Sequence, residues 1–339
     1  MLTRTLILTF CLGSLLPALA GAARYDFRAL GIESKILEET GIRLNEGYRS
    51  RECVPAYPSD HCLPTGFVDA VEKGAPFDDL WRVEVLIVDE RDAEADAILR
   101  ELALRYPREP KVMWLLAKNL FFRSERLPGH DSAGRGKALE EAIDWTVKCV
   151  EAAPLDINCH LHRGALLARL STNNGVVRSV LNGPAVRDAW QEAVHLKHHY
   201  RFPSANTSWG AANYGLGIFK RLVPDSFWLN LIFGFKGDIN QSIAYLQAAR
   251  STKDDQVEIY TELAAAYFCK YAREGDVGAR NRAREALETC FSITPPDKIS
   301  EISQQHCRML RATPEMACGY SRDRQQETSI ARFKEELNK

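Results

Sequence analysis

Residues 142–154 read A-I-D-W-T-V-K-C-V-E-A-A-P, and their spacing decides the fold. Small or weakly polar side chains stand at the first, fifth and eighth positions, Ala142, Thr146 and Cys149, and Pro154 stands at the thirteenth. On a helix these three side chains share one face. A small first residue lets a partner helix approach closely, and the proline ends the helix. The stretch therefore predicts a helix that packs against a neighbour and then stops.

The same spacing returns at intervals along the chain. It is typical of the second helix of a tetratricopeptide repeat (TPR). We therefore expect an all-α fold, a TPR-like solenoid of antiparallel helix pairs with long connectors. The further copies are Ala95, Leu99, Leu102 and Pro107; Ala189, Ala193 and Leu196, with Arg201 in place of the proline; Ser242, Leu246 and Ala249 without one; and Ala283, Leu287, Cys290 and Pro295.

First helices are predicted where apolar stripes precede these second helices, each with a small residue for close packing. Ala95, Ala142 and Ala189 are 47 residues apart, against about 34 in an ordinary repeat. We assign the surplus to loop-like connectors at 128–134, at 171–175 and around 234–237. The first-helix stripes are Met113, Leu116, Ala117 and Leu120; His160, Gly164 and Leu167; and Tyr260, Leu263, Ala264 and Tyr267.

The N-terminus predicts export. Arg4 precedes an apolar run over 6–16, and Ala18-Leu19-Ala20 matches a signal-peptidase site. The run is shorter than the ~20 residues that span a bilayer, so we expect cleavage, a chain that does not span the membrane, and a periplasmic or secreted location. Cys11 follows the bulky Phe10, which disfavours lipidation. The predicted organisation is a signal peptide (1–20), an N-terminal helical and loop extension (21–80), the repeat domain (81–320) and a charged tail (321–339).

Cysteine usage agrees with export. Without Cys11 an even number remains, and no C-x-x-C motif appears, so disulfides are expected. Cys149 ends one second helix and Cys159 begins the next first helix, which predicts that they are joined. Cys53 and Cys62 are paired on proximity alone. For Cys269, Cys290, Cys307 and Cys318 three connectivities are open, with a preference for Cys269 with Cys307.

Charge and motifs exclude several functions. The 44 basic and 45 acidic residues nearly cancel, which disfavours nucleic-acid binding. No G-x-S-x-G, H-E-x-x-H or P-loop motif occurs, so we expect neither an enzyme nor a cofactor. Five histidines are predicted to gather at one end of a helix pair, but no carboxylate completes a metal site and histidine is common at helix ends, so no metal is expected. They are His160, His162, His195, His198 and His199.

Two groups of residues are candidates for binding. The concave face of such repeats is built from first helices, and here it would offer Asn158, Leu161, Ala165, Arg169 and Asn213. The second group is aromatic and lies in a connector, where packing demands less. The sequence leaves two functions open, a scaffold that binds another protein and a small-molecule or lipid-binding protein with an aromatic-lined cavity. The aromatic group is Phe227, Trp228, Phe233 and Phe235.

The stretch from Cys159 to Tyr271 resembles a known family. It contains Leu161-His162-Arg163-Gly164, Tyr214-Gly215-Leu216-Gly217, and the segment 237–249. In these motifs it is similar to the T-component family associated with bacterial TRAP transporters and to proteins of the regulator of microtubule dynamics type. The T-component resemblance implies a periplasmic helical-repeat protein that forms homo-oligomers and docks on another envelope protein, a solute-binding protein.

Overall fold

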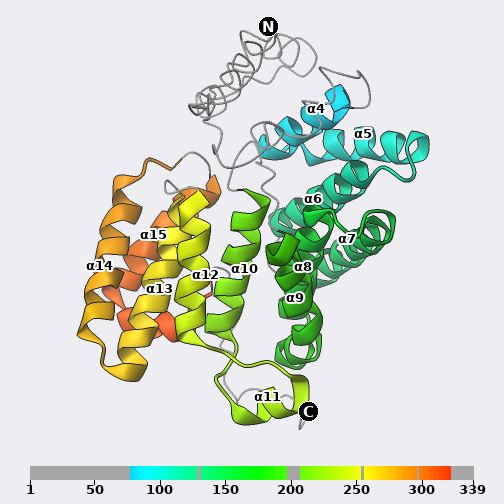
Figure 1. Cartoon of the computed structure of the whole chain (residues 1–339). Coiled ribbons are helices and arrows are strands. Elements are labelled where there is room, and N and C mark those ends of the chain that lie inside the picture. The colour runs from blue at the N-terminus through cyan, green and yellow to red at the C-terminus, as the bar shows by residue number, and fades with distance from the viewer. Residues whose placement is uncertain (1–76, 128–130, 197–206, 253–255, 296–297, 322–339) are drawn as a thin grey trace, which may run out of the picture.

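The chain folds into α-helices throughout the part that the structure describes. The computed structural model describes residues 77–127, 131–196, 207–252, 256–295 and 298–321 (Figure 1). Twelve α-helices and one 3₁₀-helix succeed one another in this part. They are α4 (Phe77–Val88), α5 (Asp92–Arg105), α6 (Pro110–Arg126), α7 (Ser132–Ala152), α8 (Ile157–Asn173), α9 (Val176–Leu196), α10 (Ser208–Leu222), α11 (Phe227–Phe233), α12 (Ile239–Thr252), α13 (Val257–Glu274), α14 (Val277–Ser292), α15 (Lys298–Ala312) and η2 (Pro314–Cys318).

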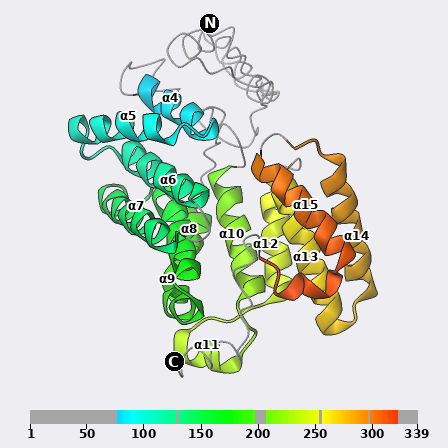
Figure 2. The ribbon, with the colours of Figure 1, turned by 180° about the vertical axis from the view of Figure 1, so that it is seen from behind.

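The helices pack as sequential antiparallel pairs, which is the TPR-like arrangement that the sequence predicts. The pairs are α4 with α5, α6 with α7, α8 with α9, α10 with α12, and α13 with α14. Each pair then contacts the next, for example α7 with α8. Figures 1 and 2 show the row of pairs from the cyan end, through α10 in the middle, to the orange α14 and α15. The short helix α11 stands apart, in the connector between α10 and α12.

The small and apolar positions of the second helices form the interior of the row. Ala142, Thr146 and Cys149 have no exposed surface, and the matching residues of α5, α12 and α14 are equally buried. On α9 the first two positions are buried and the third, Leu196, is partly buried. These contacts confirm the predicted register of the second helices.

Trp190 sets the distance between three helices. It lies on α9, and its indole ring passes over Gly164 of α8 and Gly215 of α10. A Cβ atom at Gly164 would stand 2.5 Å from the ring, and a Cβ atom at Gly215 would stand 2.6 Å from it. The Trp190 ring fits between the helices because Gly164 and Gly215 have no side chains in its place.

The surplus repeat length lies largely in longer helices. The predicted loop at 171–175 is wrong, because α8 continues to Asn173 and α9 already begins at Val176. Likewise α7 begins at Ser132, inside the predicted loop at 128–134, with the Asp131 carboxylate accepting a hydrogen bond from the Gly134 amide. Pro184 lies inside α9, which therefore runs through a residue that usually ends helices.

The buried apolar side chains divide into two clusters, one over α4 to α10 and one over α12 to α15 and η2. Arg221 of α10 joins them. Its guanidinium is buried, pairs with the Glu262 carboxylate of α13 at 2.6 Å, and donates to the carbonyl oxygens of Ala317 and Tyr320. A buried charge needs pairing of this kind to be tolerated.

Within the described residues, three disulfides link neighbouring elements. Cys149 of α7 is bonded to Cys159 of α8, the pair that helix stacking predicts. The preference for Cys269 with Cys307 is wrong: Cys269 of α13 bonds Cys318 of η2, and Cys290 of α14 bonds Cys307 of α15. The expected pair of Cys53 and Cys62 lies outside the described residues.

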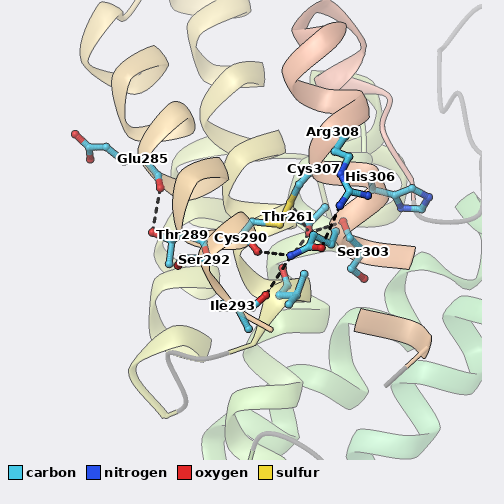
Figure 3. Close-up of a disulfide and its surroundings, with 12 residues drawn as sticks. Thr261, Glu285, Thr289, Cys290, Ser292, Ile293, Ser303, His306, Cys307 and Arg308 are labelled. Atoms are coloured by element: carbon cyan, nitrogen blue, oxygen red, sulfur yellow. Dashed lines mark hydrogen bonds between the residues drawn. A yellow bond between two sulfur atoms is a disulfide. The ribbon is translucent and has the colours of Figure 1, made fainter. Parts of the chain in front are cut away.

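Figure 3 shows the Cys290–Cys307 disulfide and its surroundings. The Gln304 amide of α15 donates to the Cys290 and Ile293 carbonyl oxygens, which satisfies the end of α14. The Thr261 hydroxyl of α13 contacts both the Cys307 sulfur and the Ser303 carbonyl oxygen. The last three helices are thus held together by covalent and polar contacts. Among the described helices, none has the length and apolar character that a membrane crossing requires.

Candidate functional site

The first helices are linked to one another by polar and aromatic pairs. Glu84 of α4 and Lys118 of α6 form an ion pair at 3.5 Å, and both side chains are buried. Burial lowers the pKa of Lys118, while the Glu84 carboxylate acts in the opposite direction. Neither residue was a candidate from the sequence. The only signal for them is a charged residue in each of the otherwise apolar runs 83–87 and 112–118.

The next link joins α6 to α8. The Trp114 indole and the His162 imidazole stack with ring centroids 5.6 Å apart and planes 13° apart. Burial, and then the nearby Lys118 ammonium, lowers the pKa of His162 to about 3. The imidazole is therefore neutral at physiological pH, because burial and the Lys118 ammonium both disfavour its charged form.

A third link joins the other ends of these two helices. The Arg169 guanidinium of α8 pairs with the Glu125 carboxylate of α6, and both side chains are mostly buried. Arg169 also contacts the Thr172 hydroxyl. The three links together tie α4, α6 and α8 into one surface, so the charged groups here hold helices in register.

The structure buries most of the residues expected on the concave face. Asn158 and Leu161 are almost fully buried, and Ala165 is partly buried against the core. Arg169 is engaged with Glu125. Asn213 is buried, and its amide donates to the Trp209 carbonyl oxygen one turn earlier. Of this group, Asn158 alone has a buried side-chain oxygen without a hydrogen-bond partner among the described residues.

The connector aromatics divide into anchors and exposed residues. Phe235 is 3% exposed, and its ring packs against Gly183 of α9 and lies 5.6 Å from the Phe219 ring. Phe233 is half-buried beside it, with ring centroids 6.2 Å apart. Phe227 and Trp228 are 70% and 67% exposed. Phe235 is thus a core residue, and Phe227 and Trp228 are the accessible members of the group.

The exposed aromatics belong to a larger apolar face on α11. Leu231 and Ile232 are also more than half exposed, and with Phe227 and Trp228 they occupy one side of the helix. We call these four residues the α11 face. Leu231 and Ile232 were not candidates from the sequence, because the segment was predicted to be a connector. The seven-residue run F-W-L-N-L-I-F is nevertheless long enough for two helical turns.

Contacts with α9 hold α11, and with it the α11 face, in place. Gly234 ends the helix in the left-handed conformation, with φ of 69°. The Arg187 guanidinium of α9 donates to the Gly234 carbonyl oxygen at 2.6 Å. With Phe235 inserted beside α9, these contacts fix the short helix against the repeat domain (Figure 1).

The histidines do not gather within the described residues. The His160 ring donates from Nε2 to the Pro154 carbonyl oxygen at 2.8 Å, His162 stacks on Trp114, and His195 is exposed on α9. His198 and His199 lie outside the described residues. Over the described ranges no group of three or more His, Cys, Asp or Glu side chains is arranged to hold a metal.

Comparison with known proteins shows a distant structural likeness. No protein-family model and no curated protein matches the chain. Among solved structures, the chain is similar to a thermophilic TPR protein of Thermus thermophilus, with 15% identity and a TM-score of 0.39. The likeness covers 66% of this chain and 87% of that one.

Proposed function

We propose that this chain is an exported, non-catalytic scaffold that binds another protein through the α11 face. One observation carries the proposal: a seven-residue helix presents four large apolar side chains to solvent. Contiguous exposed apolar surface of this kind is typical of interaction sites. The TPR-like fold supports the same function, because stacked repeats create extended surfaces for protein partners.

The geometry of the face favours a partner with an apolar groove. Phe227, Trp228, Leu231 and Ile232 follow the spacing with which helical anchors enter grooves. The helix is already formed and held by Phe235 and Arg187, so little ordering is needed on binding. Exposed Trp and Phe side chains are also the types that dominate interface energetics.

Photo-crosslinking in the producing cell tests this function. A benzoylphenylalanine placed at Trp228 should capture one partner, and the same group at Leu104, which is 85% exposed on α5, should not. Ile232→Glu should remove the crosslink from position 228 without unfolding the protein, because Ile232 is exposed. Identical crosslinked species from both positions, or an undiminished crosslink in Ile232→Glu, would contradict a specific role for the α11 face.

Export is the second part of the proposal. It rests on the signal-peptide pattern and on three disulfides, which persist mainly in oxidising compartments. Edman sequencing of the protein recovered from the periplasmic fraction or the culture medium should give Gly21 as the first residue. An intact Met1 on protein recovered from the cytoplasm would contradict export.

A narrower form of the proposal follows the T-component resemblance, namely a scaffold accessory to solute transport whose partner is a solute-binding protein. This narrower form is tested by identifying the protein that crosslinks at position 228, which should be a solute-binding protein. The alternative of a lipid cavity lined by connector aromatics has less support, because Phe227 and Trp228 are exposed on a helix. Native mass spectrometry showing a retained lipid that Trp228→Ala releases would favour that alternative.

A further inference from the structure

The C-terminal end of the row carries a partly open pocket away from α11, with Arg284, Glu288 and Arg311 at its exposed side. Residues of α13, α14, α15 and η2 surround a volume of ≈ 420 Å³. Phe268 and Leu287 are buried residues of its lining, and Pro314 also lines it. A volume of this order accommodates a small organic molecule.

Two disulfides frame this pocket. Cys269 follows Phe268 directly on α13 and bonds Cys318, four residues after Pro314. Cys290 lies three residues after Leu287 on α14 and bonds Cys307, four residues before Arg311. All four elements that line the pocket are therefore fixed by covalent links, which favours a preformed site.

Three arginines give the pocket its charge. Arg280 and Arg284 come from α14 and Arg311 from α15. The Arg280 guanidinium lies over the Tyr271 ring, 5.2 Å from its centroid, and Arg311 lies over the Phe291 ring at 4.6 Å. Stacking on aromatic faces holds these guanidinium planes while leaving N–H groups for a ligand.

The cations lack carboxylate partners within the described part of the chain. None of the three arginines forms an ion pair there, and the Arg280 Nε atom is buried without a hydrogen-bond partner. Glu288 is the acidic residue of the lining, and it leaves the pocket with an excess of positive charge. A buried donor without an acceptor is costly unless a ligand completes it.

From this arrangement we infer that the pocket between α13, α14, α15 and η2 binds a small organic acid, with its anionic group on the arginines and its apolar body against Phe268 and Leu287. Guanidinium groups recognise carboxylates through paired hydrogen bonds, and the apolar base excludes water from beneath the ligand. This site shares no residue with the α11 face, so it stands or falls independently of the proposed scaffold function.

Binding of the aromatic anion 8-anilinonaphthalene-1-sulfonate to the full oxidised protein tests the site. We expect saturable binding to one site, about tenfold weaker in Arg280→Gln, as the loss of one charge-assisted contact implies. Glu288→Gln should tighten binding several-fold because it removes the acidic residue of the pocket. 3-Phenylpropionate should displace the probe, and the uncharged 3-phenylpropanol should not.

Two variants serve as controls. Arg308, labelled in Figure 3, lies on α15 three residues before Arg311 and is not part of the pocket lining. Arg308→Gln removes an equal charge and should leave the affinity unchanged. Ile232→Glu should also leave it unchanged, which separates the pocket from the α11 face. Circular dichroism confirms that each variant is folded.

Three results would overturn the inference. The first is equal weakening by Arg280→Gln and Arg308→Gln, which would indicate a diffuse charge effect. The second is equal displacement by the acid and the alcohol, which would indicate an apolar site without anion recognition. The third is displacement by a glutamate-rich peptide but not by 3-phenylpropionate, which would assign the pocket to a protein partner.

Discussion

At the scale of single residues, Gly164 and Gly215 are required by the packing of Trp190, unlike glycines elsewhere in the helices. Gly164→Ala places a methyl group 2.5 Å from the indole, and Trp190 cannot retreat because Gly215 lies against it as closely. We expect a loss of roughly 1–3 kcal/mol in the free energy of unfolding, measured by urea titration.

Gly136 is the matched control for this change. It is also inside a helix, but a Cβ atom there meets only the Asn173 amide, at 3.4 Å. Gly136→Ala should be neutral or should stabilise by roughly 0.5–1 kcal/mol through helix propensity. Equal losses from the two substitutions would mean that Trp190 does not set the helix separation.

His162 makes the free energy of unfolding depend on pH, and the direction of its pKa shift fixes the sign. Its pKa falls to about 3 in the folded state from an ordinary value of 6.5, so between these values the unfolded chain binds a proton that the folded chain does not. Stability is therefore fully present above pH 6.5 and decreases as the pH falls, by up to about 1.4 kcal/mol per pH unit for one proton. The free energy of unfolding of His162→Phe should vary less steeply between about pH 6 and pH 4. If the free energies of unfolding of the wild type and of His162→Phe varied equally with pH, His162 would not be the source of this dependence.

The register of the second helices was predictable from the sequence, but the accessible face of the first helices was not. Thr146 and Cys149 identify a packed face because only one face of a second helix is crowded. A first helix lies between several neighbours, and on α6 every residue from Val112 to Leu120 is buried, so apolar periodicity no longer distinguishes its sides. Asn158 and Leu161 were assigned to an open face on that weakened signal, and the structure buries both.

At the scale of elements, α9 and α11 explain why the connectors were misread. Gly175, with φ of 91°, does separate α8 from α9, but α9 continues through Pro184, and Gly183 serves as the contact for Phe235. Neither that contact nor the length of the helix appears locally in the sequence. Tertiary packing decided the length of the helix here against the local preference of its residues.

The connector aromatics should differ sharply in their effect on stability. Phe235→Ala removes a buried ring that fixes the connector to α9 and should cost about 3–5 kcal/mol. Trp228→Ala should change the free energy of unfolding by less than about 0.5 kcal/mol, because the side chain is exposed. Thermal and urea unfolding of both variants give the comparison. A large loss from Trp228→Ala would show that the α11 face is covered within the protein itself.

At the scale of the whole molecule, Arg221 joins the two apolar clusters. Arg221→Ala leaves the Glu262 carboxylate buried without its partner and should cost about 3–5 kcal/mol. The double variant Arg221→Met with Glu262→Leu should recover much of that loss, because it removes both buried charges. Calorimetry of the single variant should also show whether the clusters unfold separately once the link is gone. A double variant as unstable as the single one would show that packing, not charge pairing, makes the link.

The three disulfides have a consequence for biosynthesis. Cys269, Cys290, Cys307 and Cys318 pair as first with fourth and second with third, so one loop is nested inside the other. On the export route proposed above, oxidation in order of emergence from the translocation pore would join Cys269 to Cys290, a bond that native pairing must later break. Correct maturation then depends on thiol–disulfide exchange. Cells without a disulfide isomerase should accumulate this mispaired form, which non-reducing peptide mapping detects. Cys149 and Cys159 are consecutive cysteines with a sequence separation of 10, so they should still pair correctly.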